Sequence, residues 1–478
     1  MKVLRTFGVG LFILLALASV GFSQTWTALK NQPTFAPNDA LLLTDGRVIV
    51  QDTNAADWWV LTPDNTGNYV NGTWSKIASL QSGYQPLYHT AAILPDGRLV
   101  IQGGEYNGGN NGVWTNQGSI YDPLKNKWTA LTPPAGWSEI GDCQSVILTN
   151  GTLMIGDPFD EADAQFNAKT LKYKVLAGTG KSDRNDEEGW LLLPNGEVLT
   201  TDAINSPNSE IFNPKTQKWA TGGSTIVHLA DPGSQEIGPM VLRPDGTVFA
   251  TGASTSTGHT AIYNTKTKKW AAGPDFKTGL DIADGPASLL PDGNVLVMTS
   301  PGIFNSGVQF FEWNGKKLVN APNITGASTI PSFVGDMLVL PTGQVLLTTQ
   351  GSTATYVYTA KGSAKAAWAP TITNAPSSVT RGNTYKITGT QFNGLSQGAA
   401  YGDDTQSATN YPLVRITNNA TKHVFFARTH DHSTMAVATG TKPVFTNFDV
   451  SANTETGASS LVVVTNGIPS AAVAVTVN

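Results

Sequence analysis

The sequence has one cysteine, few charged residues and no long apolar run beyond its first residues. With Cys143 alone, no disulfide can form within the chain, so its stability must come from the burial of a core. Charged residues make up 14% of the chain and the formal net charge is -5, which leaves no basic surface for a nucleic acid. No later segment approaches the roughly 18 apolar residues of a membrane-spanning helix. We therefore expect neither a nucleic-acid partner nor a membrane span.

The first residues have the pattern of a secretory signal peptide. Lys2 and Arg5 precede an apolar run from Leu11 to Val20, and the small residues Gly21 and Ser23 follow it. We therefore predict a signal peptide over residues 1–23 and a protein that is secreted or held at the cell surface.

An internal repeat dominates the next 350 or so residues. An apolar strand, a tight turn and a second apolar strand recur seven times at intervals of about 50 residues. The copies include LLLTDGRVIV from residue 41, LLLPNGEVLT from 191 and LVLPTGQVLLT from 338. The turn glycines are Gly46, Gly97, Gly151, Gly196, Gly246, Gly293 and Gly343. Because Asp-Gly and Asn-Gly turns supply the positive φ that tight hairpins require, each copy predicts two antiparallel strands.

A second element follows the hairpin in several repeats, with two aromatic residues seven positions apart on either side of a polar turn. The pairs are Tyr121 and Trp128, Phe166 and Tyr173, Phe212 and Trp219, and Tyr263 and Trp270. This element predicts a third and a fourth strand in each repeat. Four-stranded units of this kind bury both faces only by stacking around an axis. We predict a seven-bladed β-propeller over residues 24–369, its last blade completed by the strand at either Trp26 or Trp368.

These repeats resemble kelch-repeat propellers, and most of all the galactose oxidase and glyoxal oxidase branch. The resemblance covers about residues 25 to 370, although the Gly-Gly pair expected after the second strand stands clearly only at Gly103 and Gly104. From residue 370 the pattern changes to alternating runs, such as TYKITGTQF from 384 and SLVVVT from 460. This tail, with Gly-Ile-Pro-Ser at Gly467 to Ser470, resembles the early-set immunoglobulin-like domain of galactose oxidase relatives. We expect an all-β chain in which a β-sandwich over 370–478 follows the propeller.

Acidic residues converge on one mouth of the predicted propeller. The first strand of each blade lines the axis, and its starting end opens on the same face as the end of the second strand. The predicted mouth comprises Asp39, His89, Asp142, Glu188, Glu236, Asp284 and Asp336, with Asp52, Glu105, Asp157 and Asp202 at second-strand ends. So many like charges would raise some pKa values or require a cation. The alternative is ordinary polarity of strand ends, where water reaches the side chains.

The resemblance to the oxidases implies a copper ion bound by two histidines and two tyrosines, one tyrosine being joined to a cysteine. Tyr88 and His89 match the family's Tyr-His pair, Cys143 matches its cysteine, and Thr429-His430 matches its tail histidine. His432 follows His430 at a spacing that places both on one face of a strand, which suits a metal pair. The order of the blades differs from the family's, and Glu187 and Glu188 stand where a tyrosine would be expected. An ordinary buried thiol is the alternative for Cys143.

The leading hypothesis is a propeller that binds a carbohydrate or an extracellular protein at its acidic mouth. One alternative is a copper-dependent oxidase with Tyr88, His89, His430 and His432 as candidate metal ligands. Another is a non-redox enzyme acting on polysaccharides. For the two enzymatic alternatives together, the candidate catalytic residues are Tyr88, Cys143, Glu187 and Glu188. The cofactor question stays open between copper and calcium, and the oligomeric state is not predicted. No phosphate loop, His-Glu-x-x-His helix or nucleophile elbow is present.

Overall fold

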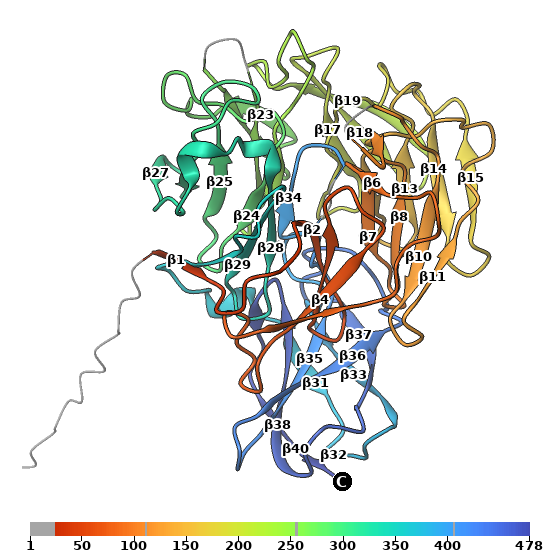
Figure 1. Ribbon diagram of the computed structural model, residues 1–478, viewed down its shortest axis with the longest axis vertical. Helices are drawn as coiled ribbons and strands as arrows, with labels where there is room; N and C mark the ends of the chain where they lie inside the picture. The colour runs from red at the N-terminus through yellow and green to blue at the C-terminus, as the bar shows by residue number, and fades with distance from the viewer. Residues whose placement is uncertain (1–23, 110–111, 254–256, 405–406) are drawn as a thin grey trace, which may run out of the picture.

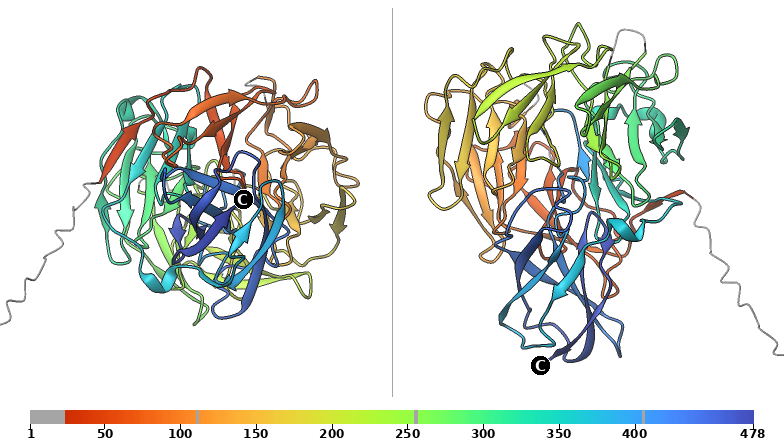
Figure 2. Two further views of the ribbon diagram at one scale, coloured as in Figure 1. Left: turned by 90° about the horizontal axis from the view of Figure 1, so that it is seen from below. Right: turned by 180° about the vertical axis from the view of Figure 1, so that it is seen from behind.

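The computed structural model describes residues 24–109, 112–253, 257–404 and 407–478. The predicted signal peptide, residues 1–23, lies outside the described residues. Within the described ranges, seven antiparallel sheets surround an axis, and the tail lies below this ring (Figure 1). The view from below places the tail inside the outline of the ring (Figure 2). None of the helices in these ranges is long and apolar enough to cross a membrane. The predicted all-β, seven-bladed fold is confirmed.

Each blade has four strands, and the first strands of neighbouring blades lie next to one another in a closed ring. Blades one to three consist of β2 (Pro37–Leu42), β3 (Val48–Asp52), β4 (Trp58–Thr62) and β5 (Thr73–Lys76); β7 (Thr90–Ile93), β8 (Leu99–Gln102), β10 (Gly118–Asp122) and β11 (Lys127–Ala130); and β12 (Ser145–Ile147), β13 (Leu153–Gly156), β14 (Asp163–Asn167) and β15 (Lys172–Leu176). A short pair, β6 (Pro86–Leu87) and β9 (Tyr106–Asn107), extends blade two.

Blades four to six continue the same plan. They consist of β16 (Leu191–Leu192), β17 (Val198–Thr201), β18 (Asn208–Asn213) and β19 (Lys218–Ser224); β20 (Met240–Leu242), β21 (Thr247–Thr251), β22 (Thr260–Asn264) and β23 (Lys269–Ala272); and β24 (Ala287–Leu289), β25 (Val295–Thr299), β26 (Gln309–Trp313) and β27 (Leu318–Asn320). Three single-turn 3-10 helices follow along the chain, η1 (Ala327–Thr329), η2 (Ser332–Val334) and η3 (Ala366–Trp368).

The N-terminal strand closes the ring. Blade seven consists of β28 (Gly335–Val339), β29 (Val345–Thr349), β30 (Tyr356–Thr359) and β1 (Thr25–Ala28). Trp26 stands opposite Tyr358 in the antiparallel pairing of β1 with β30, and their ring centroids are 4.8 Å apart. The strand at Trp26, and not the one near Trp368, therefore completes the last blade.

The repeat signals of the sequence correspond to local structure. All seven turn glycines have φ between 79° and 85°, the left-handed region that residues with a side chain adopt at a cost. The aromatic pairs face each other across the third and fourth strands, as Tyr121 does Trp128 and Tyr263 does Trp270, with ring centroids 5.0 Å apart in both. Each pair buries apolar surface between blades, so one short pattern specifies both the strand register and the packing.

The tail is a curled sheet that folds over on itself. Its strands are β31 (Thr371–Asn374), β32 (Ser378–Val379), β33 (Thr384–Thr390), β35 (Leu413–Asn418), β36 (Val424–His430), β37 (Pro443–Asp449), β38 (Gly457–Thr465), β39 (Ile468–Pro469) and β40 (Val473–Val477). The first half of β36 pairs with β35 and its second half with β37, so one strand joins both layers. Between the layers lies a core that includes Ile387, Val414 and Phe448. The predicted sandwich is therefore a single bent sheet.

One stretch of the tail enters the propeller. The axial segment, residues 396–404 and 407–411, contains β34 (Ala399–Ala400), which pairs with β24 of blade six. Figure 1 and the right view of Figure 2 show β34 raised above the rest of the tail, among the propeller strands. Because each first strand has an edge toward the axis that no neighbouring strand covers, its backbone groups need partners there. The axial segment supplies such partners to blades one, four and six.

Four blades hold the axial segment by hydrogen bonds. The Leu192 amide of blade four donates to Gln397 Oε1 at 2.7 Å, and the Leu289 amide of blade six donates to the Gly398 carbonyl at 2.6 Å. On the other side, Ser407 Oγ donates to Asp336 of blade seven at 3.0 Å, and the Tyr411 hydroxyl donates to a carbonyl of blade one. The segment is thereby fixed on the axis.

Close packing on this segment can be tested at Gly189, just before β16. A Cβ at residue 189 would lie 2.3 Å from the carbonyl oxygen of Gly402. Because that atom belongs to the backbone, one of the two backbone segments would have to move. We expect Gly189→Ala to lower the free energy of unfolding by about 1–3 kcal/mol, measured by chemical denaturation. Gly112→Ala is the control, because a Cβ there meets nothing within 4 Å. Equal stability of the two variants would contradict the tight fit.

Candidate functional site

A cavity of about 240 Å³ lies at the mouth of the propeller, around the upper end of the axial segment. Every described residue that lines it carries either a carboxylate or an aromatic ring. The carboxylates are Glu105, Asp142, Glu187, Glu236, Asp284, Asp403 and Asp404, and the aromatic residues are Tyr88, Tyr106, Phe304 and Phe333. This composition makes the cavity the candidate functional site.

Equivalent positions of three repeats deliver one side chain each to the cavity. Tyr88, Glu187 and Asp284 each lie nine residues before the turn glycine of their own repeat. All three have left-handed backbone, with φ of 50°, 59° and 48°. Such residues cost on the order of 1 kcal/mol each and persist where the surrounding strands enforce them. The propeller thus holds the same strained conformation at three points around one cavity.

The axial segment adds two carboxylates that the sequence analysis did not assign. Asp403 and Asp404 are only 2% and 1% exposed, and both line the cavity. Their sequence, Tyr-Gly-Asp-Asp, lies between strands of the tail, and nothing in its local pattern points toward the propeller mouth. The only feature of this sequence that could have pointed to a site is the pair of acidic residues. The pair lies in a long segment of the tail that lacks the alternating apolar residues of a strand.

The carboxylates form two groups that share Glu187. Asp142, Glu187 and Asp403 each offer an oxygen within 4.8 Å of the others, and so do Glu187, Glu236 and Asp284. Two oxygens bound to one calcium ion at 2.3–2.6 Å can be at most about 5 Å apart, so both groups fit that limit. Glu236 and Asp284 lie within hydrogen-bond distance of each other, so a hydrogen bond between them requires that one of the two carries a proton. The cavity therefore offers converging oxygen donors.

Burial and mutual repulsion keep protons on these groups. Burial, followed by the charges of Asp142 and Glu236, raises the pKa of Glu187 well above its ordinary value. Burial and the neighbouring Asp284 raise the pKa of Glu236 to about 10. The pKa values of Asp142, Asp284 and Asp403 are raised well above the ordinary range for the same two reasons, with burial the larger cause. A cation in the cavity would replace those protons.

Two acidic groups lie side by side in the chain but enter different environments. Glu187 lines the cavity, whereas Glu188 is buried beside Lys181, whose Nζ lies 2.8 Å from its carboxylate. Lys181 also contacts Asp183 at 2.8 Å and Glu210 at 3.0 Å. Glu188, Asp183 and Asp202 bring oxygens within 4.8 Å of one another, so this lysine already supplies the cation of a second acidic cluster. Burial and the nearby Asp183 raise the pKa of Asp202 to about 7.

Asp39, His89 and Asp336, which were also predicted at the mouth, are buried among the strands around the axis and do not line the cavity. Asp39 and His89 are buried, with His89 Nε2 at 3.6 Å from Asp39 Oδ2. Burial lowers the pKa of His89 to about 3 and, with the charge of Asp336, raises that of Asp39. Asp336 accepts hydrogen bonds from the Ala40 amide at 2.7 Å and from Ser407. Asp336 thus joins blades one and seven to the axial segment.

The tail histidines predicted from the oxidase resemblance lie far from Tyr88 in the fold. His430 contacts Asp431 at 2.7 Å and Asp449 at 3.2 Å, both in the tail. The His432 amide donates to the carbonyl of Pro95, in the turn that follows β7, whereas Tyr88 precedes β7 at its mouth end. Tyr88 and the two tail histidines therefore lie at opposite ends of the propeller, and none of the described residues lining the cavity is a histidine.

Cys143 is a buried member of the core between the blades. Burial raises the pKa of its thiol, which therefore stays protonated and unreactive. Among the described residues, the lining of the mouth offers only oxygen donors, which suit calcium, magnesium or manganese better than copper. The residues present thus do not fit the copper centre that the resemblance implied.

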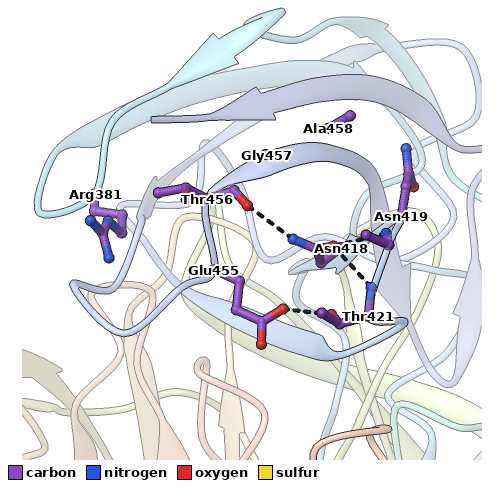
Figure 3. Close-up of a pocket in the computed structure, with 9 residues that line it drawn as sticks. Arg381, Asn418, Asn419, Thr421, Glu455, Thr456, Gly457 and Ala458 are labelled. Carbon is purple, nitrogen blue, oxygen red and sulfur yellow. Dashed lines mark hydrogen bonds between the residues drawn. The ribbon is translucent and has the colours of Figure 1, made fainter.

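A larger hollow of about 720 Å³ lies on the tail (Figure 3). Its polar groups bond to one another: Asn418 Nδ2 donates to the Thr456 carbonyl at 3.1 Å, and Thr421 Oγ1 donates to Glu455 at 2.5 Å (Figure 3). Glu455 also contacts His423 at 2.6 Å. With its polar groups paired locally, this hollow offers no set of converging donors, so the axial cavity is the stronger candidate.

Removal of the buried cation tests the second acidic cluster. We expect Lys181→Met to lower the free energy of unfolding by about 3–5 kcal/mol, because it leaves buried carboxylates without a counter-charge. Lys125→Met is the control: its pair with Asp122 is on the surface and should contribute less than about 1 kcal/mol. Chemical denaturation at neutral pH measures both, and a similar loss in the two variants would contradict the role given to Lys181.

The chain matches the Kelch motif family over residues 86–135. No curated protein matches it. Among solved structures, it is similar to a fungal alcohol oxidase of the AA5 family in complex with copper, at 14% identity and a TM-score of 0.52, covering 96% of this chain and 100% of that one. It is also similar to the extracellular domain of a hybrid two-component system of B. thetaiotaomicron, at 12% identity and a TM-score of 0.49, covering 96% and 60%. The chain thus carries a Kelch motif in its second blade, and its fold is the seven-bladed propeller and tail of the AA5 alcohol oxidase.

Proposed function

We propose that this chain is an exported carbohydrate-binding propeller whose mouth binds one sugar residue together with a divalent cation. The observation that carries the proposal is the lining of the axial cavity, in which every described residue carries a carboxylate or an aromatic ring. The carboxylates would bind the cation, and the carboxylates and rings together would bind the sugar.

The cation follows from the charge of the cavity. Seven carboxylates face a space of about 240 Å³ whose described lining contains no lysine, arginine or histidine. Ionised carboxylates at these separations repel one another strongly unless a positive charge lies between them. Carboxylate oxygens are ligands that calcium prefers. Calcium takes about six to eight oxygen ligands in all, so hydroxyl groups of a sugar can complete the set.

The sugar follows from the pairing of acceptors with rings. Ionised carboxylates accept hydrogen bonds from hydroxyl groups, and aromatic rings pack against the apolar C–H face of a pyranose. Phe304 and Phe333 are in edge-to-face contact at 5.5 Å, and so are Tyr88 and Tyr106 at 5.9 Å. The cavity has the volume of about eight water molecules, which is enough for one sugar residue.

The alternatives have less support. A copper oxidase would need nitrogen or thiolate donors at the mouth, and Tyr88 is the sole member of the predicted copper set that lines the cavity. A polysaccharide-cleaving enzyme would need one carboxylic acid and one carboxylate placed on a bound chain, and the cavity holds many carboxyl groups without a distinct pair. Export rests on the pattern of residues 1–23 and is part of the proposal.

The proposal predicts calcium-dependent binding on a glycan array. Wild-type protein should bind a defined set of glycans with calcium and lose them with a chelator. Glu187→Gln should weaken binding at least about tenfold, because Glu187 belongs to both oxygen groups. Glu197→Gln is the matched control, since Glu197 lies in the β16–β17 turn, at the other end of the blade, beside Lys268. Glycan binding that is indifferent to calcium and to Glu187 would refute the proposal.

The raised pKa values predict how calcium stabilises the protein as pH changes. Unfolded carboxyl groups release their protons near pH 4, but the folded, cation-free cavity retains them to higher pH, up to about 10 for Glu236. Stability of the cation-free protein therefore falls as pH rises above about 4, and calcium, which binds the ionised form, offsets this loss.

The thermal shift caused by calcium should consequently be larger at about pH 8 than at about pH 5. Differential scanning fluorimetry with and without calcium measures it, and Glu187→Gln should reduce the difference. A shift that is larger at the lower pH would contradict the assignment of the cavity as the cation site.

A further inference from the structure

Two exposed aromatic residues from different blades contact each other beside the mouth. Trp114, in the loop that follows β9, is 44% exposed, and Phe159, in the loop that follows β13, is 38% exposed. Their ring centroids lie 4.4 Å apart at an interplanar angle of 42°. Large aromatic side chains are among the most costly groups to leave in water, so an exposed pair of them marks a surface that binds something.

The pair is continuous with the axial cavity. Gly141 directly precedes Asp142, which lines the cavity, and a Cβ at Gly141 would lie 3.5 Å from the Trp114 ring. The Thr115 amide donates to the Gly104 carbonyl at 3.0 Å, and the Gly104 amide donates to the Gly141 carbonyl at 2.7 Å. These backbone bonds hold Trp114 against the strand start that carries Asp142.

The second ring is equally fixed. The Phe159 amide donates to Asp157 Oδ1 at 3.0 Å, at the end of the second strand of blade three. Asp157 in turn donates its own amide to the Ala162 carbonyl at 2.9 Å, which closes the loop that carries Phe159. The two rings are therefore presented by hydrogen-bonded loops at the mouth face, so little conformational entropy is lost when a ligand packs on them.

We propose that Trp114 and Phe159 form a second carbohydrate subsite, on which a sugar residue next to the one in the mouth stacks. This inference rests on the proposed function and extends it: the ligand is an oligosaccharide or a chain end of at least two residues, and not a free monosaccharide. The occupant follows from the position of the rings next to the cavity. A sugar chain with one residue among the carboxylates would leave the cavity beside Asp142, and its next residue would then lie on Trp114 and Phe159. The chemistry matches as well, since the apolar face of a pyranose packs on an aromatic ring while its hydroxyls remain in water.

The test measures affinity against chain length. The probes are neutral β-1,4-linked gluco-, manno-, xylo- and N-acetylglucosamine oligosaccharides of one to six residues, titrated with calcium into wild type, Trp114→Ala, Phe159→Ala and Glu187→Gln by calorimetry. Leu124→Ala is the matched control, because Leu124 is an exposed apolar residue of the β10–β11 turn, at the other end of blade two. Exposed positions tolerate these substitutions, and the melting temperature checks that each variant is folded.

We expect wild-type affinity to rise about tenfold or more, or about 1.4 kcal/mol, between one residue and two or three, because the second residue stacks on the rings. Trp114→Ala and Phe159→Ala should lose this rise and keep the affinity for the monosaccharide, whereas Leu124→Ala should keep both. Glu187→Gln should weaken every length alike.

Three outcomes would overturn the subsite, and a fourth would overturn the proposed function. If wild type binds monosaccharides and longer chains with equal affinity, or if the rise survives in both aromatic variants, the subsite is refuted while mouth binding stands. If Trp114→Ala abolishes self-association in sedimentation and leaves all sugar affinities unchanged, the rings are a contact between two copies. If no sugar binds wild type, or if Glu187→Gln binds every sugar as wild type does, the proposed function itself fails.

Discussion

Seven first strands converge on an axis where their inner edges have no neighbour with which to pair. Buried backbone groups without partners are costly, so the centre of the ring must hold partners for them, either protein or water. Here the tail fills it, with β34 paired to blade six and side chains bonded to blades one, four and seven. The same segment carries Asp403 and Asp404 to the mouth. The requirement to satisfy backbone edges therefore also determines what the site is made of.

The molecule balances buried negative charge in two ways. In blade four, Lys181 lies among Asp183, Glu188 and Glu210 at hydrogen-bond distances, so the chain supplies its own counter-charge. At the mouth, the described lining includes no such residue, and burial keeps protons on carboxyl groups such as Glu236. The first arrangement is complete within the fold. The second depends on pH and on what the solution offers, which is the physical distinction between a structural cluster and a binding site.

The architecture was predictable from the sequence because its signals are local. Turn glycines such as Gly46 require positive φ, and pairs such as Tyr121 and Trp128 face each other across a single turn. Part of the site was predictable for the same reason, since Asp142, Glu236 and Asp284 occupy strand starts. Asp403 and Asp404 were not, because their position depends on a segment from the other domain. Nor does local pattern separate Glu187 from Glu188, whose environments diverge only when Lys181 is placed.

Ring closure joins segments that are far apart in the sequence. Gln32, just after β1, donates to the Thr355 carbonyl beside β30, and 323 residues separate the two. During synthesis β1 therefore leaves the ribosome long before its partner exists, and the axial segment is made later still. Blade seven cannot be completed, and the channel cannot be filled, until nearly the whole chain is available. The acidic mouth is consequently absent from every partly synthesised chain, and its charge is assembled only in the finished protein.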